Sequence, residues 1–173
     1  CSLGVFMGHQ LTVFETNWGW VGVAVTDRGL AGLNFPLPDR DSALRDLHER
    51  WLAGEEAEEG VFGEIIDQVR RYLAGEPVEF DLPLDWSGHT PFLQAVWRVT
   101  QSIPYGETWT YAELAEAVDR PRAYRAVGRA MAVNPIPLIV PCHRVLRSDG
   151  GLGGYGGGLD LKARLLEMER AGR

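Results

Sequence analysis

Residues 110–133 read TYAELAEAVDRPRAYRAVGRAMAV, and this stretch decides the fold expected for the second half of the chain. Its first four residues form a capping box, because the side chains of Thr110 and Glu113 can each accept a hydrogen bond from the other residue's backbone N–H. A short helix therefore begins there, and it carries Leu114 and Val118 at helical spacing.

A tight turn, Asp119-Arg120-Pro121, follows this helix, and a second helix is expected from about residue 122 to residue 133. Asn134-Pro135 ends the second helix, which carries Arg122, Arg125 and Arg129. Two short helices joined by so tight a turn are typical of a helix-turn-helix, which places its second helix in a groove of DNA. Many helical hairpins bind no nucleic acid, so the spacing alone leaves DNA binding open.

The residues on either side of this motif extend the helical pattern. Thr90-Pro91 pairs a hydroxyl cap with a proline at the first helical position, so a helix is expected from there to about Ser102. Residues 148–158 contain seven glycines and predict a loop or wing. A last helix is expected over residues 160–170. Residues 87–173 therefore predict a mainly helical domain with a winged helix-turn-helix-like motif.

The first half of the chain, residues 1–86, has the pattern of a small α+β domain that acts as a scaffold. Strands are expected within residues 11–35, and apolar residues at helical spacing predict helices. The expected helices cover residues 41–53 and 62–74, a further strand covers 80–84, and the acidic stretch 55–59 is a solvated connection. Residues 85–90 are rich in turn formers and predict the linker. The fold class is therefore α+β, with domains at 1–86 and 87–173.

Charge is distributed unevenly between these two halves, although the whole chain of 173 residues carries a net charge of −7. Residues 1–86 have 6 Arg, no Lys and 16 acidic residues, a net −10, whereas residues 87–173 have 11 basic and 8 acidic residues, a net +3. Six arginines and no acidic residue lie between Arg120 and Arg147. Such a run can be a solvated face, but it also marks a candidate phosphate-binding surface in an otherwise acidic protein.

The chain has two cysteines, Cys1 and Cys142, so a disulfide scaffold is not expected and a reducing, cytoplasmic setting fits. No apolar run approaches the roughly 18–20 residues that a membrane-spanning helix needs. Cys1-Ser2 could be the acylated start of a lipoprotein, but no lipid signal is visible and an artificial chain end explains it better.

Cys142 is the candidate nucleophile, in the sequence Pro141-Cys142-His143-Arg144. A free thiol is only a few per cent ionised at neutral pH, so it needs a base or a positive field, and His143, Arg144 and Arg147 are close in sequence. A buried structural cysteine is the alternative, and residue chemistry alone does not separate the two. A zinc site is disfavoured because adjacent Cys and His residues rarely share one metal.

These residues resemble the active-site signature of the O6-alkylguanine-DNA alkyltransferases. The resemblance rests on Pro141-Cys142-His143-Arg144-Val145 preceded by Asn134-Pro135-Ile136-Pro137, and it extends upstream. The stretches Ile103-Pro104-Tyr105-Gly106-Glu107-Thr108, Tyr111-Ala112-Glu113-Leu114-Ala115 and Arg125-Ala126-Val127-Gly128-Arg129-Ala130-Met131 follow the family's order. It covers residues 80–170 closely and the first half only in layout.

The resemblance implies a role for each matching residue of the catalytic group. Cys142 would accept the alkyl group, His143 would deprotonate it through a water, and Glu169 would orient that histidine. Asn134 would hold the turn before the active-site segment, and Tyr111 would assist the departing guanine and crowd the DNA phosphate.

The resemblance also implies a DNA-binding set and a base pocket. Arg125 would enter the duplex in place of the extruded base, with DNA contacts from Arg122, Arg129, Tyr111 and Ala126. The pocket would include Val145, Met131, Tyr155 and Gly156. Many members have serine after the pocket tyrosine, so at Gly156 a backbone N–H would replace that side chain's hydrogen bond to the base.

The implied activity is irreversible, single-use repair of O6-alkylguanine, and of O4-alkylthymine, in double-stranded DNA by a monomeric, nucleoid-associated protein without cofactor or metal. Three other classes compete with this hypothesis. A damage sensor of similar fold would lack Cys142, a transcription regulator would leave Cys142-His143 unexplained, and a cysteine hydrolase would turn over.

Overall fold

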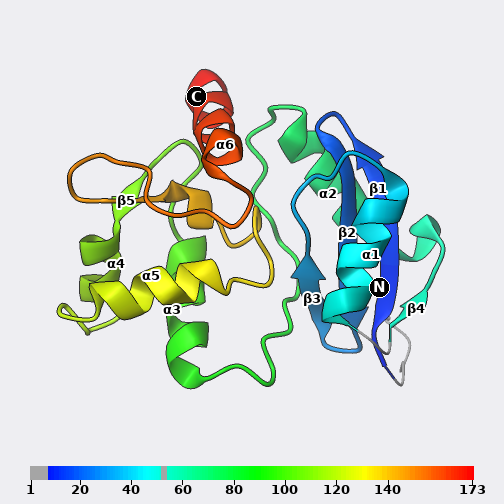
Figure 1. Ribbon diagram of the computed structural model, residues 1–173, viewed down its shortest axis with the longest axis horizontal. Helices are drawn as coiled ribbons and strands as arrows, with labels where there is room; N and C mark the ends of the chain where they lie inside the picture. The colour runs from blue at the N-terminus through cyan, green and yellow to red at the C-terminus, as the bar shows by residue number, and fades with distance from the viewer. Residues whose placement is uncertain (1–7, 52–53) are drawn as a thin grey trace. The chain divides into compact units, whose positions relative to one another are not determined.

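The computed structural model describes residues 8–51 and 54–173, which form two compact units that divide between Trp86 and Ser87 (Figure 1). Cys1, at which a lipid-modified start was weighed, lies outside the described residues. None of the helices within the described ranges is long and apolar enough to span a membrane.

The N-terminal unit is built on a four-stranded sheet in the order β3-β2-β1-β4. Strands β1 (Gln10–Thr16), β2 (Gly19–Thr26) and β3 (Gly29–Leu33) are antiparallel neighbours, which agrees with the strands expected within residues 11–35. The run Val21–Val25 is almost completely buried because helices cover the sheet.

Two helices complete this unit. Helix α1 (Arg40–Arg50) packs Ala43 and Leu47 against sheet residues, and Figure 1 shows it lying across one face of the sheet. Successive strand residues point to opposite faces, so Phe14 of β1 faces away from α1, and Arg70 of helix α2 (Gly63–Leu73) lies over its ring. The amphipathic spacing in residues 41–53 and 62–74 thus predicted both helices.

Two expectations for this unit were wrong. The acidic stretch 55–59 is not only a connection, because Glu55–Glu56 forms the short edge strand β4 parallel to β1, and Glu59–Phe62 forms a 3₁₀ turn. Residues 80–84 do not form a regular strand. They make a single bridge from Leu84 to Leu30, because Pro83 has no backbone N–H to continue a ladder.

The C-terminal unit is mainly helical, as expected. It contains α3 (Pro91–Gln101), α4 (Tyr111–Ala117), α5 (Tyr124–Ala132) and α6 (Leu159–Ala171). The capping box at Thr110 and Glu113 is present, with both reciprocal hydrogen bonds. The indole N–H of Trp97 in α3 donates to the carbonyl of Ala130 in α5 at 3.0 Å, which joins the buried sides of these two helices.

A two-stranded parallel sheet joins the helix-turn-helix to the segment that carries Cys142. Strand β5 (Trp109–Thr110) pairs with β6 (Val145–Leu146), so Trp109 lies opposite Val145 and Thr110 opposite Leu146. Helix α4 begins at the residue after β5, and β6 begins directly after the 3₁₀ turn Cys142–Arg144. The start of the helix-turn-helix and the candidate nucleophile are therefore neighbours in space.

Candidate active site

Cys142 is held by a buried loop that Asn134 organises. The side-chain amide of Asn134 donates to the carbonyl of Val140 at 2.9 Å, and its oxygen accepts from the backbone N–H of Ile136 at 3.0 Å. Leu138, in the middle of this loop, adopts a positive φ of 72°, which a non-glycine residue seldom adopts unless its surroundings enforce it. Asn134 therefore lies where it can hold the turn that the resemblance assigns to it.

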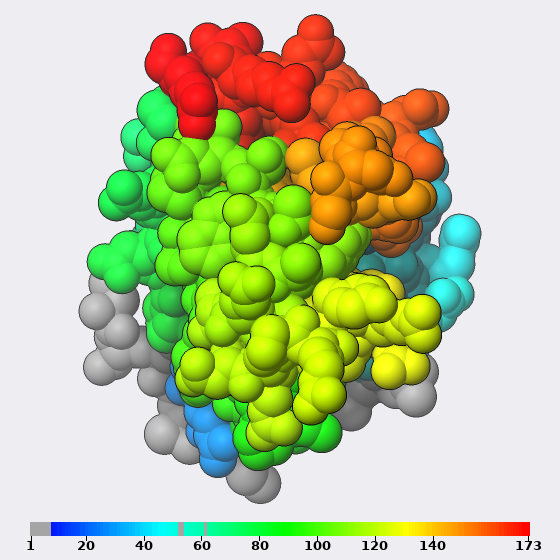
Figure 2. All heavy atoms as spheres, turned by 90° about the vertical axis from the view of Figure 1, so that its left-hand side faces the viewer, coloured from blue at the N-terminus to red at the C-terminus, as the bar shows by residue number. Residues whose placement is uncertain are grey.

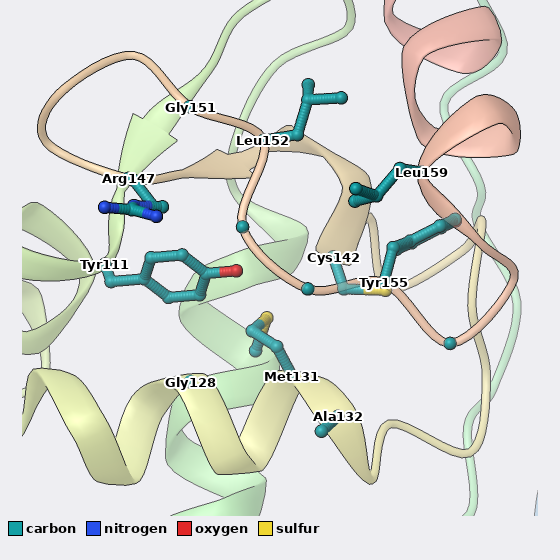
Figure 3. Close-up of a pocket in the computed structure, with 13 residues that line it drawn as sticks. Tyr111, Gly128, Met131, Ala132, Cys142, Arg147, Gly151, Leu152, Tyr155 and Leu159 are labelled. Carbon is teal, nitrogen blue, oxygen red and sulfur yellow. The ribbon is translucent and has the colours of Figure 1, made fainter.

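The sulfur of Cys142 lies in the wall of a cavity of about 950 Å³ (Figure 3). The cavity is lined by residues from α4, α5, the 3₁₀ turn, the segment after β6, the glycine-rich loop and the start of α6, namely Tyr111, Gly128, Met131, Ala132, Cys142, Arg147, Gly151, Leu152, Gly153, Gly154, Tyr155, Gly156 and Leu159. Of the expected pocket residues, Met131, Tyr155 and Gly156 line it. Val145 does not line it, and this residue of β6 is completely buried.

One glycine of this loop is required by close approach to Tyr111. Gly153 has a φ of 72°, and a Cβ atom built on it would lie 2.8 Å from the Tyr111 hydroxyl oxygen. A side chain at this position would be strained and would push Tyr111 aside. The loop backbone thus packs directly against the Tyr111 hydroxyl in the cavity wall.

Behind Cys142, a buried network joins His143, Arg144 and Glu169. The Nε2 atom of His143 lies 2.7 Å from a carboxylate oxygen of Glu169, and Arg144 Nε and Nη2 donate to the same carboxylate at 2.9–3.1 Å. Arg144 Nη1 also donates to the carbonyl of Ile103 at 2.6 Å, and the N–H of Gly106 donates to Glu169 at 3.0 Å. Glu169 is thus not a solvated charge of the terminal helix, since it is completely buried.

The charges in this network determine which nitrogen of His143 can act as a base. Burial alone would raise the pKa of the Glu169 carboxyl, but hydrogen bonds from His143 and Arg144 hold it well below its usual range. Burial lowers the pKa of His143, so the imidazole is neutral at neutral pH even though Glu169 favours its charged form. An ionised Glu169 can only accept, so His143 Nε2 carries the proton and Nδ1 is the basic nitrogen.

Burial raises the pKa of the Cys142 thiol, so the site must favour the thiolate by other means. A hydrogen bond from Asn134, the positive charge of Lys162 and the backbone N–H groups of Cys142 and His143 all act in that direction. The sequence offered His143, Arg144 and Arg147 together as nearby sources of a base or a positive field. Of these, the Arg144 guanidinium is held by Glu169.

Lys162 is the residue that sequence reasoning missed. Its side chain is completely buried, and its ammonium group donates to the carbonyls of Val145 (2.7 Å) and Leu152. It lies 6.0 Å from the ring centre of Tyr111 and 5.8 Å from that of Tyr155. Lys162 shares a helical face with Leu165, Leu166 and Glu169, and this spacing is the signal that could have found it.

The candidate DNA-binding residues lie on and beside α5. Arg125 and Arg129 are exposed on this helix, and the Arg125 guanidinium lies 5.9 Å from the ring centre of Tyr124. Ala126 is half-buried. Arg122 is exposed but precedes the helix, because residues 119–123 form a turn in which the N–H of Ala123 donates to the carbonyl of Arg120. The helix therefore begins two residues later than expected, at Tyr124.

Within residues 8–51 and 54–173, no group of three or more His, Cys, Asp or Glu side chains is arranged to hold a metal ion. The site itself brings together a thiol, a neutral imidazole, a phenol and a buried ammonium. That set suits proton transfer and nucleophilic displacement.

Each of the two units matches a family model of known proteins. Residues 11–86 match the family model described as "6-O-methylguanine DNA methyltransferase, ribonuclease-like domain", and residues 91–171 match "6-O-methylguanine DNA methyltransferase, DNA binding domain". A methylated-DNA–protein-cysteine methyltransferase of Methanosarcina acetivorans is 41% identical over 157 residues, which cover 91% of this chain and 96% of the relative. One from Mycobacterium leprae is 53% identical over 113 residues, or 65% of this chain and 68% of the relative.

Solved structures are similar over nearly the whole chain. The structure of Mycobacterium tuberculosis OGT in complex with DNA matches with a TM-score of 0.79 and 38% identity, covering 94% of this chain and 93% of that one. The O6-methylguanine-DNA methyltransferase of Pyrococcus kodakaraensis matches with a TM-score of 0.66 and 26% identity, covering 93% and 98%. The α+β architecture with a helical second domain is therefore shared with these proteins.

Proposed function

The chain belongs to the 6-O-methylguanine DNA methyltransferase family, and we propose that Cys142 is the residue that accepts the alkyl group. Its function is DNA repair by alkyl transfer from a damaged guanine in DNA to a cysteine of the protein. One observation supports the choice of residue most strongly: the Cys142 sulfur faces a cavity beside the helix-turn-helix, with the His143–Glu169 pair behind it.

In the proposed reaction, His143 takes the proton of the Cys142 thiol through a water, and the thiolate attacks the alkyl carbon. The new C–S bond forms as the bond from that carbon to O6 of guanine breaks, and its electron pair goes to the base. Tyr111 supplies the proton that keeps the departing guanine neutral. Burial and the neighbouring Cys142 raise the pKa of Tyr111, so its hydroxyl keeps its proton until the base needs it. The thioether is chemically inert, so each molecule acts once.

The damaged base reaches this cavity only after leaving the stacked duplex, at a cost of a few kcal/mol. We propose that Arg125, exposed near the start of α5, fills the space that the base leaves. Arg122, Arg129 and Ala126 would then lie near the DNA backbone.

The cavity also has room for O4-alkylthymine, which we propose as a second substrate. The N-terminal unit carries a net charge of −10, so we assign it a scaffold role away from DNA.

Mass spectrometry tests the proposed acceptor directly. Incubation with duplex DNA that contains one O6-methylguanine should add one methyl mass to the peptide that contains Cys142. The modification should plateau at one methyl group per protein molecule, however much substrate is present. Sustained turnover, or a methyl group on another residue, would contradict the proposal.

Arg125→Ala is expected to slow repair of duplex DNA by roughly tenfold while leaving reaction with the free base O6-methylguanine unchanged. A side chain that fills the gap in the base stack affects the rate only when the substrate is a duplex, and lost stacking costs about 1–3 kcal/mol. Single-turnover rates on the two substrates measure this difference. Equal slowing on both substrates would show that Arg125 acts inside the pocket or on folding instead.

Lys162→Met is expected to slow the alkylation of Cys142 by iodoacetamide at neutral pH and to shift the rate profile to higher pH. Burial lowers the pKa of Lys162 to about 8, so the ammonium is still largely charged at neutral pH and favours the nearby thiolate. A loss of roughly tenfold fits one charge–charge interaction of about 1 kcal/mol or slightly more. Below its pKa the thiol reacts faster as the pH rises. Removing the cation raises the pKa of the Cys142 thiol, so the increase in rate should occur at higher pH.

Lys162→Arg is the matched control, because it keeps the positive charge at this position. Its profile should lie closer to that of the unmodified protein than the profile of Lys162→Met does. Thermal unfolding of both variants separates a charge effect from a loss of structure, since Met leaves the carbonyls of Val145 and Leu152 without their donor. Identical pH profiles for Lys162→Met and the unmodified protein would rule out the electrostatic role.

A further inference from the structure

A second, smaller hollow of the C-terminal unit lies next to the cavity that contains Cys142. It measures about 440 Å³ and is lined by Tyr111, Ala112, Tyr124, Arg147, Ser148 and Asp149. Two residues, Tyr111 and Arg147, line both hollows and form the wall between them. Figure 3 shows the Arg147 guanidinium beside the Tyr111 ring. Figure 2 shows the surrounding face, with the glycine-rich loop (orange) beside the segments of the helix-turn-helix (green to yellow).

Arg147 is held at this rim by a tight turn and by Asp149. The backbone N–H of Arg147 donates to the carbonyl of Gly151 at 2.9 Å, and the N–H of Gly150 donates to the carbonyl of Arg147 at 3.0 Å. One carboxylate oxygen of Asp149 accepts from the N–H of Gly151 at 2.9 Å, and the other accepts from Arg147 Nη2 at 2.8 Å. Asp149 therefore both caps the turn and binds the arginine.

The ion pair between Arg147 and Asp149 is easily exchanged. Their side chains are 61% and 60% exposed, and an ion pair in that setting contributes only about 0–1 kcal/mol. Asp149 is also the only acidic residue between Asp119 and Asp160, a stretch that otherwise carries six arginines. A backbone phosphate carries the same single negative charge as Asp149, but it can offer the guanidinium two oxygens, whereas Asp149 offers one because its other oxygen accepts from Gly151.

We propose that Arg147 binds a backbone phosphate of the DNA strand that carries the everted base, and that this phosphate displaces Asp149. The inference rests on the proposed function. A base in the larger cavity leaves its sugar and phosphate at the cavity's rim, and the rim beside Tyr111 is where Arg147 and the smaller hollow lie. Asp149 thus occupies the phosphate position in the free protein and keeps the arginine oriented for exchange.

Two charge-removing variants with opposite expected effects test this exchange. In a Cys142→Ala background, Arg147→Gln should weaken binding to a duplex that contains O6-methylguanine by about fivefold at moderate salt. The plot of log K against log salt concentration should become less steep by about 0.9, the value for one phosphate contact. Asp149→Asn should instead tighten binding by about two- to threefold, because the amide oxygen can still cap Gly151 but no longer competes with phosphate.

Removing any acidic residue near DNA can tighten binding, so the two variants are also combined. If Asp149 acts by occupying Arg147, the gain from Asp149→Asn should shrink when Arg147 is already glutamine. Arg170→Gln is the matched control for charge, because Arg170 is an exposed arginine at the end of α6. Fluorescence anisotropy at four or five salt concentrations gives all the binding constants.

The outcomes separate this inference from the proposed function. A salt dependence for Arg147→Gln equal to that of Arg170→Gln, or a fully additive double variant, would overturn the exchange. With Cys142 intact, Arg147→Gln should slow transfer from duplex DNA but not from free O6-methylguanine, and equal slowing would place Arg147 in the base pocket instead. If the protein with all native residues transfers no alkyl group from either substrate, the proposed function itself has failed.

Discussion

Replacing Cys142 with alanine is expected to abolish methyl transfer completely while leaving the protein folded and able to bind a duplex that contains O6-methylguanine. Among the described residues that line the cavity, Cys142 is the only one with a thiol, and the thioether of Met131 cannot form a thiolate. The binding residues proposed here, on α5 and at the cavity rim, are untouched. Transfer of a labelled methyl group and fluorescence anisotropy on the same preparations measure the two properties.

Cys142→Ser is the informative companion to this variant. It keeps a small polar side chain at the same position, but a hydroxyl is far harder to ionise than a thiol and should be equally inactive. If Cys142→Ala retained measurable transfer, another residue would be the acceptor. If it lost lesion binding with its fold intact, the base would have to bind elsewhere than in this cavity.

Replacing Glu169 with glutamine is expected to have the largest effect on stability, lowering the free energy of unfolding by about 3–5 kcal/mol. The buried guanidinium of Arg144 would lose the anion that compensates it, and burial of an unpaired charge is costly. Transfer should also slow by about a hundredfold, because His143 would lose the carboxylate that fixes its tautomer. Denaturant unfolding and single-turnover kinetics measure the two losses separately.

Glu167→Gln is the matched control, because Glu167 is an exposed glutamate two residues away on the same helix. It should change neither stability nor rate measurably. The transfer rate of Glu169→Gln is measured at a temperature where this variant is still folded. There, Glu169 acts as a positioning residue if the remaining rate recovers as the pH rises, since hydroxide then replaces the weakened base. A rate deficit that does not depend on pH would indicate a purely structural role.

Much of the fold could be predicted because local signals and tertiary packing agree. The capping box at Thr110, the Thr90-Pro91 start of α3 and the apolar spacing in α2 act within one turn of helix, so the sequence shows them directly. The short strand β4 could not be predicted from Glu55 and Glu56. These are poor strand formers, and they pair only because the edge of β1 is available.

The residues of the candidate site also divide into those that the sequence shows locally and those that depend on long-range packing. Cys142 and His143 are adjacent in sequence, so the sequence shows a thiol beside a base, while the roles proposed for them come from the family resemblance. Lys162 could not be identified by its residue type, because a lysine in a terminal helix is normally solvated. Its burial depends on two carbonyl groups, one in β6 and one in the glycine-rich loop, and long-range packing brings these together. Closeness in sequence to Cys142 also does not reveal that the Arg144 guanidinium pairs with Glu169, which lies in the last helix.

The pairing of β5 with β6 has a consequence for how this protein could be re-engineered. Two residue pairs fix where the helix-turn-helix starts relative to the reactive sulfur, and a slip of one position would turn every side chain in the short ladder to the opposite face. The helix-turn-helix therefore cannot be exchanged independently of the strand that pairs it with β6. A helix-turn-helix grafted from another protein would need to include a strand that pairs with β6 in the same register. Without that strand, the bound lesion would not lie beside the Cys142 sulfur.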